Sequence, residues 1–377
     1  MRVARIEVFH IDIPYKKVFR IATAEYRSQP FVVVHVVADD GSEGWGEACP
    51  AHEFTGETGG TVFSIIAELL GRRLIGRDPM GLEDLVLRAM GGVAGAPSAK
   101  AALDMALHDL AAKALGVPLY RLLGGPVRRS FPVTGGASLA GIEETLEKVG
   151  RDVERGIRVL KIKVGEDPER DAEKVRRVRE VVGDKPVIRV DANQGWWRPR
   201  RAIRAIRLME RYGIELVEQP VAAWDLDGLA EVRRAVDTPI MVDESVHTPL
   251  DVVRVAEKRA ADIVNIKLMK TGGIRMALRV AAVAEAMGLE AYMGSMGETA
   301  IGRAANIHLA LSLDVIRYGD IAGVVREWGI VEDIAEGLRE GMVNGALHVL
   351  PPRKPGLGVE VRREVLEKYL VNHTVIK

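Results

Sequence analysis

Short apolar runs that each end in a charged side chain recur along the middle of the chain. The runs read VLKIKVG, VDANQGW, LVEQP, MVDES and NIKLMKTGG. Their charges are Lys163, Asp191, Glu218, Asp243 and Lys267. The last four charges are about 24 to 27 residues apart, a length that fits one strand, one helix and two connecting loops. This pattern predicts strands that alternate with helices, and hence a parallel sheet with helices outside it.

The same period extends to eight candidate strands. They end near Thr134, Lys163, Asp191, Glu218, Asp243, Lys267, Gly294 and Asp320. The segments between them, such as 202–212 and 250–260, carry an apolar stripe at helical spacing and basic residues on the other face. Eight such units predict an α/β fold of the (β/α)₈ TIM barrel type, in which the carboxyl ends of the strands converge on one site.

The chain outside this repeat follows other patterns. Residues 1–125 begin with strand-like runs, continue with Ala, Leu and Met at helical spacing, and predict a small α+β domain. Within it, the polar stretch FRIATAEYRSQ (19–29) lacks a period and predicts a mobile loop. We expect the barrel to occupy residues 126–325, and the C-terminal segment 326–377, which loses the period, to pack back on the first domain.

Composition narrows the possible functions. The 377 residues include 53 basic and 53 acidic side chains, so no net charge attracts nucleic acid or an anionic membrane. No run approaches the length of a membrane span, and the N-terminus lacks the apolar block of a signal peptide, so we expect a cytoplasmic protein. The single cysteine, Cys49, excludes an internal disulfide and a cysteine-built metal site.

Three carboxylates occupy the ends of successive predicted strands. Asp191, Glu218 and Asp243 would lie side by side at one edge of the barrel mouth. Each alone could be an ordinary surface acid, but three at the same phase of one repeat would repel one another unless a cation lay among them. Oxygen-only ligands favour a hard divalent ion, Mg²⁺ first and Mn²⁺ second.

Two lysines flank the predicted metal site. Lys163 and Lys267 end the second and sixth strands, which face each other across an eight-stranded barrel. Lys161 precedes Lys163 by two residues and would point inward with it, and a buried lysine is costly without a task. A small carboxylate substrate on the metal would therefore have one amine on each face. One lysine would remove the proton α to the carboxylate, and the metal would stabilise the enediolate. Return of a proton gives racemisation or epimerisation, whereas loss of a leaving group gives elimination or cycloisomerisation.

Several motifs carry a family resemblance. KIKVG, DANQGW, VEQP, DES and NIKLMKTGG, together with GWGEA, AKAALDMALHDL and PGLGVEV, resemble the enolase superfamily and its muconate-lactonising-enzyme subgroup. FTGET and GSMGET are most similar to dipeptide epimerases of the Ala-Glu type. The resemblance implies a capping α+β domain on a modified barrel, metal binding by Asp191, Glu218 and Asp243, and Lys163 and Lys267 as the two bases. It also implies inversion of the C-terminal residue of a dipeptide, and a homo-oligomer.

The chain departs from the dipeptide epimerase pattern at two places. Those enzymes end strand eight with Asp-x-Asp, which holds the substrate ammonium, but here Ala322 follows Asp320 at the second position. Ala24 stands where Ala-Glu epimerases carry an arginine. The expected substrate is therefore a dipeptide or an N-modified amino acid, bound by Lys161, Asp320 and Ser295. A muconate-type cycloisomerase with the same metal and lysines is the alternative, and a ligand-binding barrel without turnover is a third hypothesis.

Overall fold

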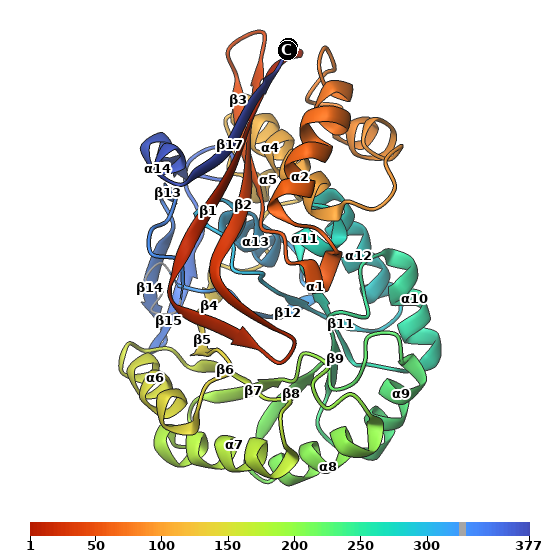
Figure 1. Ribbon diagram of the computed structural model, residues 1–377, viewed down its shortest axis with the longest axis vertical. Coiled ribbons are helices and arrows are strands. Elements are labelled where there is room, and N and C mark those ends of the chain that lie inside the picture. Colours follow the sequence, from red (N-terminus) through yellow and green to blue (C-terminus); the bar gives the residue numbers. More distant parts are fainter. Residues whose placement is uncertain (324–328) are drawn as a thin grey trace.

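The barrel is an eight-stranded parallel sheet in which every strand pairs with its neighbour in the chain (Figure 1). The computed structural model describes residues 1–323 and 329–377. The eight strands are β5 (Thr134–Ala137), β6 (Val159–Lys163), β7 (Val187–Asp191), β8 (Ile214–Glu218), β9 (Ile240–Val242), β10 (Ile263–Ile266), β11 (Glu290–Met293) and β12 (Ile316–Gly319). The Thr134 hydroxyl donates to the Gly319 carbonyl oxygen at 2.7 Å and so links the two outer strands. The predicted barrel fold is confirmed.

Seven of the predicted strand ends lie within one residue of the observed ends. The first prediction was wrong, because Thr134 begins β5 rather than ending it. The residues before it form β4 (Phe131–Pro132), which pairs with the antiparallel hairpin of β14 (Arg339–Val343) and β15 (Ala346–Leu350). The residues before Thr134, which were predicted to be part of the first barrel strand, therefore belong to a small separate sheet beside the barrel.

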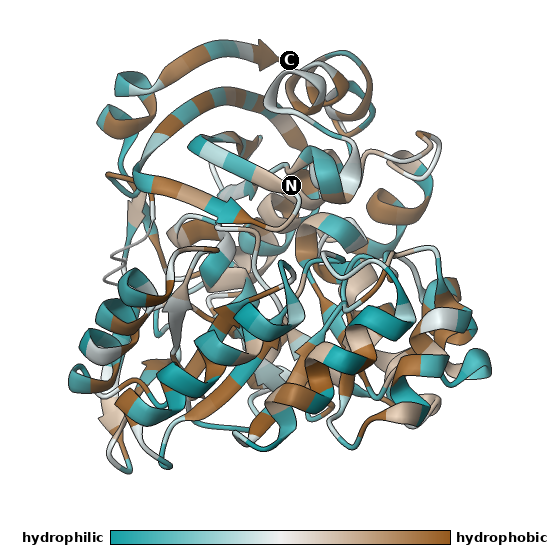
Figure 2. Ribbon diagram, turned by 60° about the horizontal axis from the view of Figure 1, so that its bottom comes forward, coloured by the Kyte–Doolittle hydropathy of each residue, from teal (hydrophilic) through white to brown (hydrophobic). Residues whose placement is uncertain are grey.

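Helices surround the sheet, and all except the wholly buried α11 and α13 bury one face. They are α6 (Ile142–Glu154), α7 (Pro168–Val182), α8 (Pro199–Glu210), α9 (Leu226–Ala235), α10 (Pro249–Lys258), α11 (Leu268–Thr271), α12 (Ile274–Ala286) and α13 (Ala300–Ser312). In α8 the buried side chains are Ala202, Ala205, Ile206 and Met209, at the spacing that an amphipathic helix requires. Figure 2 shows hydrophilic residues on the outward faces of these helices. Within the described residues, no helix is both long and apolar enough to cross a membrane.

The capping domain consists of an antiparallel sheet and a set of helices. The sheet has the order β17-β1-β2-β3, with β1 (Val3–Ile21), β2 (Ala24–Ala38), β3 (Glu43–Ala48) and β17 (Leu370–Ile376). The helices are α1 (His52–Thr55), α2 (Gly59–Ile65), α3 (Leu82–Asp84), α4 (Pro97–Ala114) and α5 (Leu119–Leu122), with short π- and 3₁₀-turns at 66–73 and 85–89. Helix α4 packs directly on β3: a Cβ at Gly44 or Gly46 would lie 2.1 Å from a carbonyl oxygen of α4, so only glycine allows this contact.

The loop predicted at residues 19–29 is in fact the end of a long hairpin. Strand β1 continues to Ile21, β2 begins at Ala24, and the pair Arg20 and Glu25 forms an ion pair of 2.7 Å across the two strands. Cross-strand backbone pairing thus orders a stretch whose polar sequence has no period. The hairpin reaches over the mouth of the barrel (Figure 1), where the Leu139 amide donates to the Arg20 carbonyl oxygen at 2.8 Å.

The C-terminal segment returns to the capping domain. After β14 and β15 come β16 (Glu360–Val361), which pairs with β13 (Ala335–Glu336), then α14 (Arg363–Lys368) and β17. Strand β17 pairs antiparallel with β1, so the two ends of the chain share one sheet. The predicted boundary between residues 325 and 326 lies outside the described residues.

A buried histidine joins the barrel to both neighbouring parts of the chain. His308 on α13 accepts a hydrogen bond from the Tyr120 amide at Nδ1 (3.0 Å), and its Nε2–H donates to the Leu357 carbonyl oxygen (3.2 Å). Burial lowers the pKa of His308 to about 4. Protonation would also remove the acceptor that Tyr120 uses, so the ring is neutral in the folded protein.

We expect this histidine to make the fold sensitive to acid. Its folded pKa lies below the unfolded value of 6.5, so its contribution is complete above pH 6.5 and is lost as pH falls toward 4. The loss is about 3 kcal/mol by pH 4. Urea unfolding at pH 7 and pH 4 measures it. His308→Gln should lose correspondingly less stability between these pH values, and an equal loss in both proteins would contradict the assignment.

Candidate active site

Three acids gather at the carboxyl ends of neighbouring barrel strands. Asp191 ends β7, Glu218 ends β8 and Asp243 follows β9, and all three side chains are fully buried. Asp191 and Glu218 are direct partners in the parallel register. The sequence prediction placed these three residues on adjacent strand ends, and the structure has them at the ends of three neighbouring strands.

The acids interact strongly with one another. Burial, followed by the charges of Asp191 and Asp243, raises the pKa of Glu218 to about 7. Burial and the same two carboxylates raise the pKa of Glu244 to about 8. Four carboxyl groups in one buried region are unfavourable unless positive charge compensates them.

Lysine ammonium groups compensate part of this charge. Lys161 Nζ lies 3.0 Å from Asp191 Oδ2 and 2.7 Å from Glu218 Oε2, and Lys163 Nζ lies 2.6 Å from Asp191 Oδ2. On the other side, Lys267 Nζ lies 2.7 Å from Asp243 Oδ2. Burial raises the pKa of Asp191, but Lys161 and Lys163 outweigh it and hold that pKa well below its usual range.

The chemistry of these acids fits a hard divalent cation. The candidate metal ligands are all carboxylate oxygens. Two further buried oxygens, Glu244 Oε2 and Asn265 Oδ1, have no hydrogen-bond partner in the described part of the chain. Each of the three acids is paired with a lysine. Among residues 1–323 and 329–377, no three acidic, histidine or cysteine side chains lie close enough together to bind one metal ion. A metal ion would therefore compete with Lys161 for the oxygens of Asp191 and Glu218.

Lys163 and Lys267 lie on opposite sides of the acids. Lys163 ends β6 and Lys267 directly follows β10, and β7, β8 and β9 lie between these strands in the sheet. Lys163 also donates to Asn193 Oδ1 at 2.8 Å, and the Phe54 ring of the capping domain covers Lys267 Nζ at 4.3 Å from its centroid. Each of the two amines therefore contacts a carboxylate and one further side chain.

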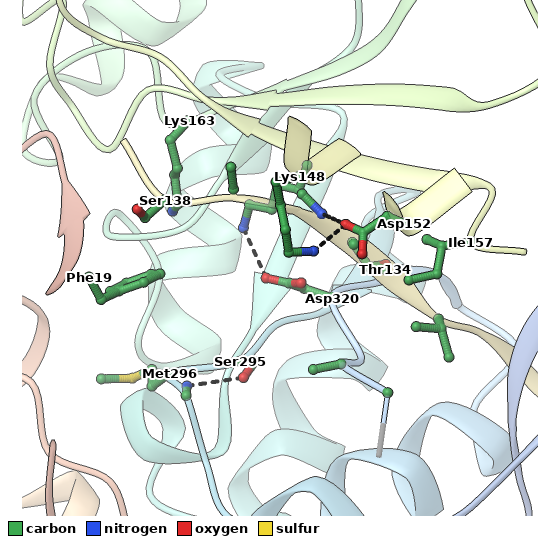
Figure 3. Close-up of a pocket in the computed structure, with 18 of the residues that line it drawn as sticks. Phe19, Thr134, Ser138, Lys148, Asp152, Ile157, Lys163, Ser295, Met296 and Asp320 are labelled. Atoms are coloured by element: carbon green, nitrogen blue, oxygen red, sulfur yellow. Dashed lines mark hydrogen bonds and ion pairs between the residues drawn. The ribbon is translucent and has the colours of Figure 1, made fainter. Parts of the chain in front are cut away.

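Both lysines border a cavity at the barrel mouth. This first cavity, of about 200 Å³, extends from Lys163 and Lys267 past Asp320 and Ser295 to α6. Figure 3 shows Lys163, Ser295 and Asp320 around the same space. Asp320 is paired with Lys161 at 3.3 Å. All three residues predicted to bind substrate, Lys161, Asp320 and Ser295, line this cavity.

A second, smaller cavity opens from the same two lysines toward the capping domain. It has a volume of about 60 Å³, and Lys163, Lys267, Ser295 and Met296 form its barrel side. Its roof comes from the β1–β2 hairpin and from the segment around α1, through Ile21, Tyr26, Gln29, Ala51, Glu53 and Phe54. The lysines thus stand where two cavities meet.

Several residues of the site were not predicted from the sequence. Asn265 donates to Glu218 Oε1 at 2.7 Å, and Lys270 Nζ lies 2.6 Å from Asp243 Oδ1. Asn265 lies two residues before Lys267 on the same face of β10, so strand periodicity could have identified it. Phe54 begins the FTGET motif, but that motif indicated only the family, and no signal marked Glu53 or the contact of Phe54 with Lys267, because contacts between separate domains leave no local pattern.

Two polar residues that follow the acids in the sequence support the site from behind. Asn193 lies two residues after Asp191, and Glu244 comes directly after Asp243. The side-chain Nδ2 of Asn193 donates to Glu244 Oε1 at 3.2 Å, and the backbone N–H of Asn193 donates to Asp191 Oδ1 at 3.0 Å. These hydrogen bonds connect the ends of β7 and β9 and fix the orientation of Asp191.

Family models match both halves of the chain. The model described as "Enolase C-terminal domain-like" matches residues 144–365, and "Mandelate racemase / muconate lactonizing enzyme, N-terminal domain" matches residues 5–124. The chain belongs to the enolase superfamily. The family predicted from the sequence motifs is thereby confirmed.

Its relatives in the superfamily are isomerases. The chain is 38% identical to the L-Ala-D/L-Glu epimerase of Clostridium acetobutylicum, over 96% of this chain and 99% of that protein. It is 34% identical to the N-succinyl-L-Arg/Lys racemase of Bacillus cereus over the full length of both, and the crystal structure of that racemase has a TM-score of 0.94. A dipeptide epimerase from Cytophaga hutchinsonii, crystallised with Mg and D-Ala-L-Val, is 29% identical over the full length of both chains, with a TM-score of 0.92. Muconate and chloromuconate cycloisomerases also match, at 32–34% identity.

Proposed function

We propose that this chain is an isomerase that inverts the α-carbon of a dipeptide or an N-acylated amino acid by moving its α-proton. The observation that supports this most strongly is the placement of Lys163 and Lys267. They stand on opposite sides of three buried acids and line the same cavities. A relative named for L-Ala-D/L-Glu epimerisation matches 96% of the chain, and one named for racemising N-succinyl-L-Arg/Lys matches all of it.

In the proposed reaction the two lysines have different roles. The substrate lies with its α-carbon between the two lysines. One lysine, as the neutral amine, takes the α-proton and becomes an ammonium, while the electron pair of the C–H bond moves into the substrate carboxylate to give an enediolate. The other lysine, as an ammonium, delivers its proton to the opposite face. Phe54 over Lys267 and the β1–β2 hairpin over the mouth limit the access of water to the enediolate.

Asp191, Glu218 and Asp243 are the residues that would hold Mg²⁺, for which Mn²⁺ is the nearest substitute. When bound, the ion would neutralise the substrate carboxylate and so make the α-proton more acidic. Asn265, through its bond to Glu218, and Lys270, beside Asp243, would orient the two acids for that ion. The zero net charge of the chain supports a small molecule rather than a nucleic acid as the partner.

Asp320 favours this function over a cycloisomerase. Its carboxylate faces the first cavity, and its side chain is 27% exposed there. A dipeptide with a free ammonium would be attracted to it, whereas muconate has no cationic group for Asp320 to bind.

Replacing Asp320 should therefore separate two kinds of substrate. We expect Asp320→Asn to raise KM about 10-fold or more for dipeptides with a free amine, because a charged hydrogen bond contributes about 1.5–3 kcal/mol. N-acylated amino acids should change much less. Steady-state kinetics on both substrate types measures the difference, and equal changes would mean that Asp320 does not contact an ammonium.

The proposed reaction is tested by hydrogen exchange. The wild-type protein is incubated in D₂O with Mg²⁺ and a library of dipeptides and N-succinyl amino acids, and α-proton signals are followed by NMR. Some members should lose the signal and accumulate the opposite configuration. Absence of exchange across the library, with metal binding shown separately, would exclude the epimerase. Formation of a lactone from muconate would support the cycloisomerase instead.

A further inference from the structure

Most polar groups in the second cavity are already engaged within the protein. Gln29 accepts from the Tyr15 hydroxyl at 2.9 Å and donates to the Pro50 carbonyl oxygen at 3.2 Å. The Ser295 hydroxyl donates to Glu298 and accepts from the Gly297 amide at 3.1 Å. These side chains build the wall of the cavity and have little capacity left for a ligand.

Glu53 is the exception on the capping side. Its side chain is only 13% exposed, and its Oε1 accepts a hydrogen bond from the Tyr26 hydroxyl. Its Oε2 is buried and makes no hydrogen bond to any described residue, although His52 Nδ1 lies 3.5 Å away and the charge of Lys267 also acts on this carboxyl group. A buried carboxylate oxygen without a donor is costly, so this position favours a ligand that brings one. Burial raises the pKa of Glu53, the charge of Lys267 partly opposes that rise, and a second cation beside the carboxylate would oppose it further.

The position of Glu53 relative to the lysines indicates which part of a substrate it would meet. An α-carbon held between Lys163 and Lys267 lies where the two cavities join. Two of its substituents, the amino or acylamino group and the side chain, must then enter different cavities. The first cavity contains Asp320, which suits the amino end, so the side chain enters the second cavity and points toward Glu53.

We propose that Glu53 selects substrates whose α-carbon carries a cationic side chain of the lysine or arginine type. This inference rests on the proposed function, because it requires the α-carbon to lie between the two lysines. Tyr26 is the positioning residue: its hydroxyl occupies Oε1 and leaves Oε2 for the ammonium or guanidinium. A neutral side chain would leave that oxygen unpaired, and an acidic one would add repulsion.

A matched pair of substrates tests the proposal. N-succinyl-lysine and N-succinyl-norleucine share the same four-carbon chain and lack a free α-amine, so they differ only in the side-chain ammonium. We expect wild-type kcat/KM to favour the lysine compound about 30-fold or more, since losing one partner of a buried charge pair costs about that factor. In Glu53→Gln the ratio should approach one. Glu25→Gln removes a neighbouring acid that does not line the cavity and should keep the wild-type ratio. Equal rates for both compounds, or a preference unchanged in Glu53→Gln, would overturn the proposal.

A binding measurement separates this inference from the proposed reaction. Calorimetry with the same two compounds and Mg²⁺ compares affinities whether or not turnover occurs. If neither compound exchanges its α-proton, but the lysine compound binds more tightly and the advantage disappears in Glu53→Gln, the reaction is wrong and the cation subsite stands. If exchange occurs while the two compounds bind equally, the reaction stands and the subsite is wrong.

Discussion

Replacing either flanking lysine by alanine should abolish interconversion of the two epimers, while each variant still exchanges the α-proton of one epimer. The reason is geometric: Lys163 and Lys267 stand on strands separated by three others, so each amine reaches only one face of the α-carbon. Loss of a general base or acid lowers the rate about 10²- to 10⁴-fold. In D₂O, Lys163→Ala should exchange the epimer whose proton faces Lys267, and Lys267→Ala the other epimer.

The complementary pattern is the decisive part of this prediction. NMR of each pure epimer with each variant gives four time courses, of which two should show exchange without inversion. Lys258→Ala, on the outer face of α10, should match the wild type in all of them. If both variants lost exchange with the same epimer, the two amines would act on one face. If either variant kept full epimerisation, that lysine would have no part in proton transfer.

The second large effect concerns the acids. Asp191→Asn, Glu218→Gln and Asp243→Asn should each abolish the rise in thermal stability that Mg²⁺ gives the wild-type protein, and lower kcat about 10²- to 10³-fold or more. Each substitution removes one negative charge from a fully buried cluster that would otherwise bind the ion. Thermal unfolding with and without Mg²⁺, together with kinetics after chelation and metal return, measures both consequences.

Two outcomes would contradict the role of the acids. The first is a wild-type protein that keeps full activity after complete removal of divalent metal. The second is a variant that loses activity but binds Mg²⁺ as tightly as the wild type. Asp225→Asn is a suitable comparison, because this residue caps α9 through the Gly228 amide and lies outside both cavities, so it should keep the response to Mg²⁺.

The barrel was predictable because its sequence repeats. Five successive strands are mainly apolar and are each ended or directly followed by a charged residue at a nearly regular spacing, so the sequence alone aligns Lys163, Asp191, Glu218, Asp243 and Lys267. Strand periodicity also predicted that Lys161 and Lys163 share a face, and both contact Asp191. Local pattern was sufficient wherever a site residue belongs to the repeat.

The remaining features depend on contacts that the repeat does not encode. The hairpin at residues 19–29 is ordered by cross-strand pairing, which a polar sequence does not reveal. Phe54 and Glu53 reach the lysines only because the capping domain packs on the barrel. Likewise, the bridge that Lys161 forms between Asp191 and Glu218 follows from side-chain reach, and the sequence could predict only that all three are close.

The most direct test of this account is a crystal structure of the protein with Mg²⁺ and a slowly reacting substrate, such as an N-succinyl amino acid bound to Lys163→Ala. We expect one ion held jointly by Asp191, Glu218 and Asp243, the substrate carboxylate beside it, and the α-carbon between Lys267 Nζ and the position that Lys163 occupies in the wild type. An ion bound elsewhere, or an α-carbon with both lysine positions on the same face, would contradict it.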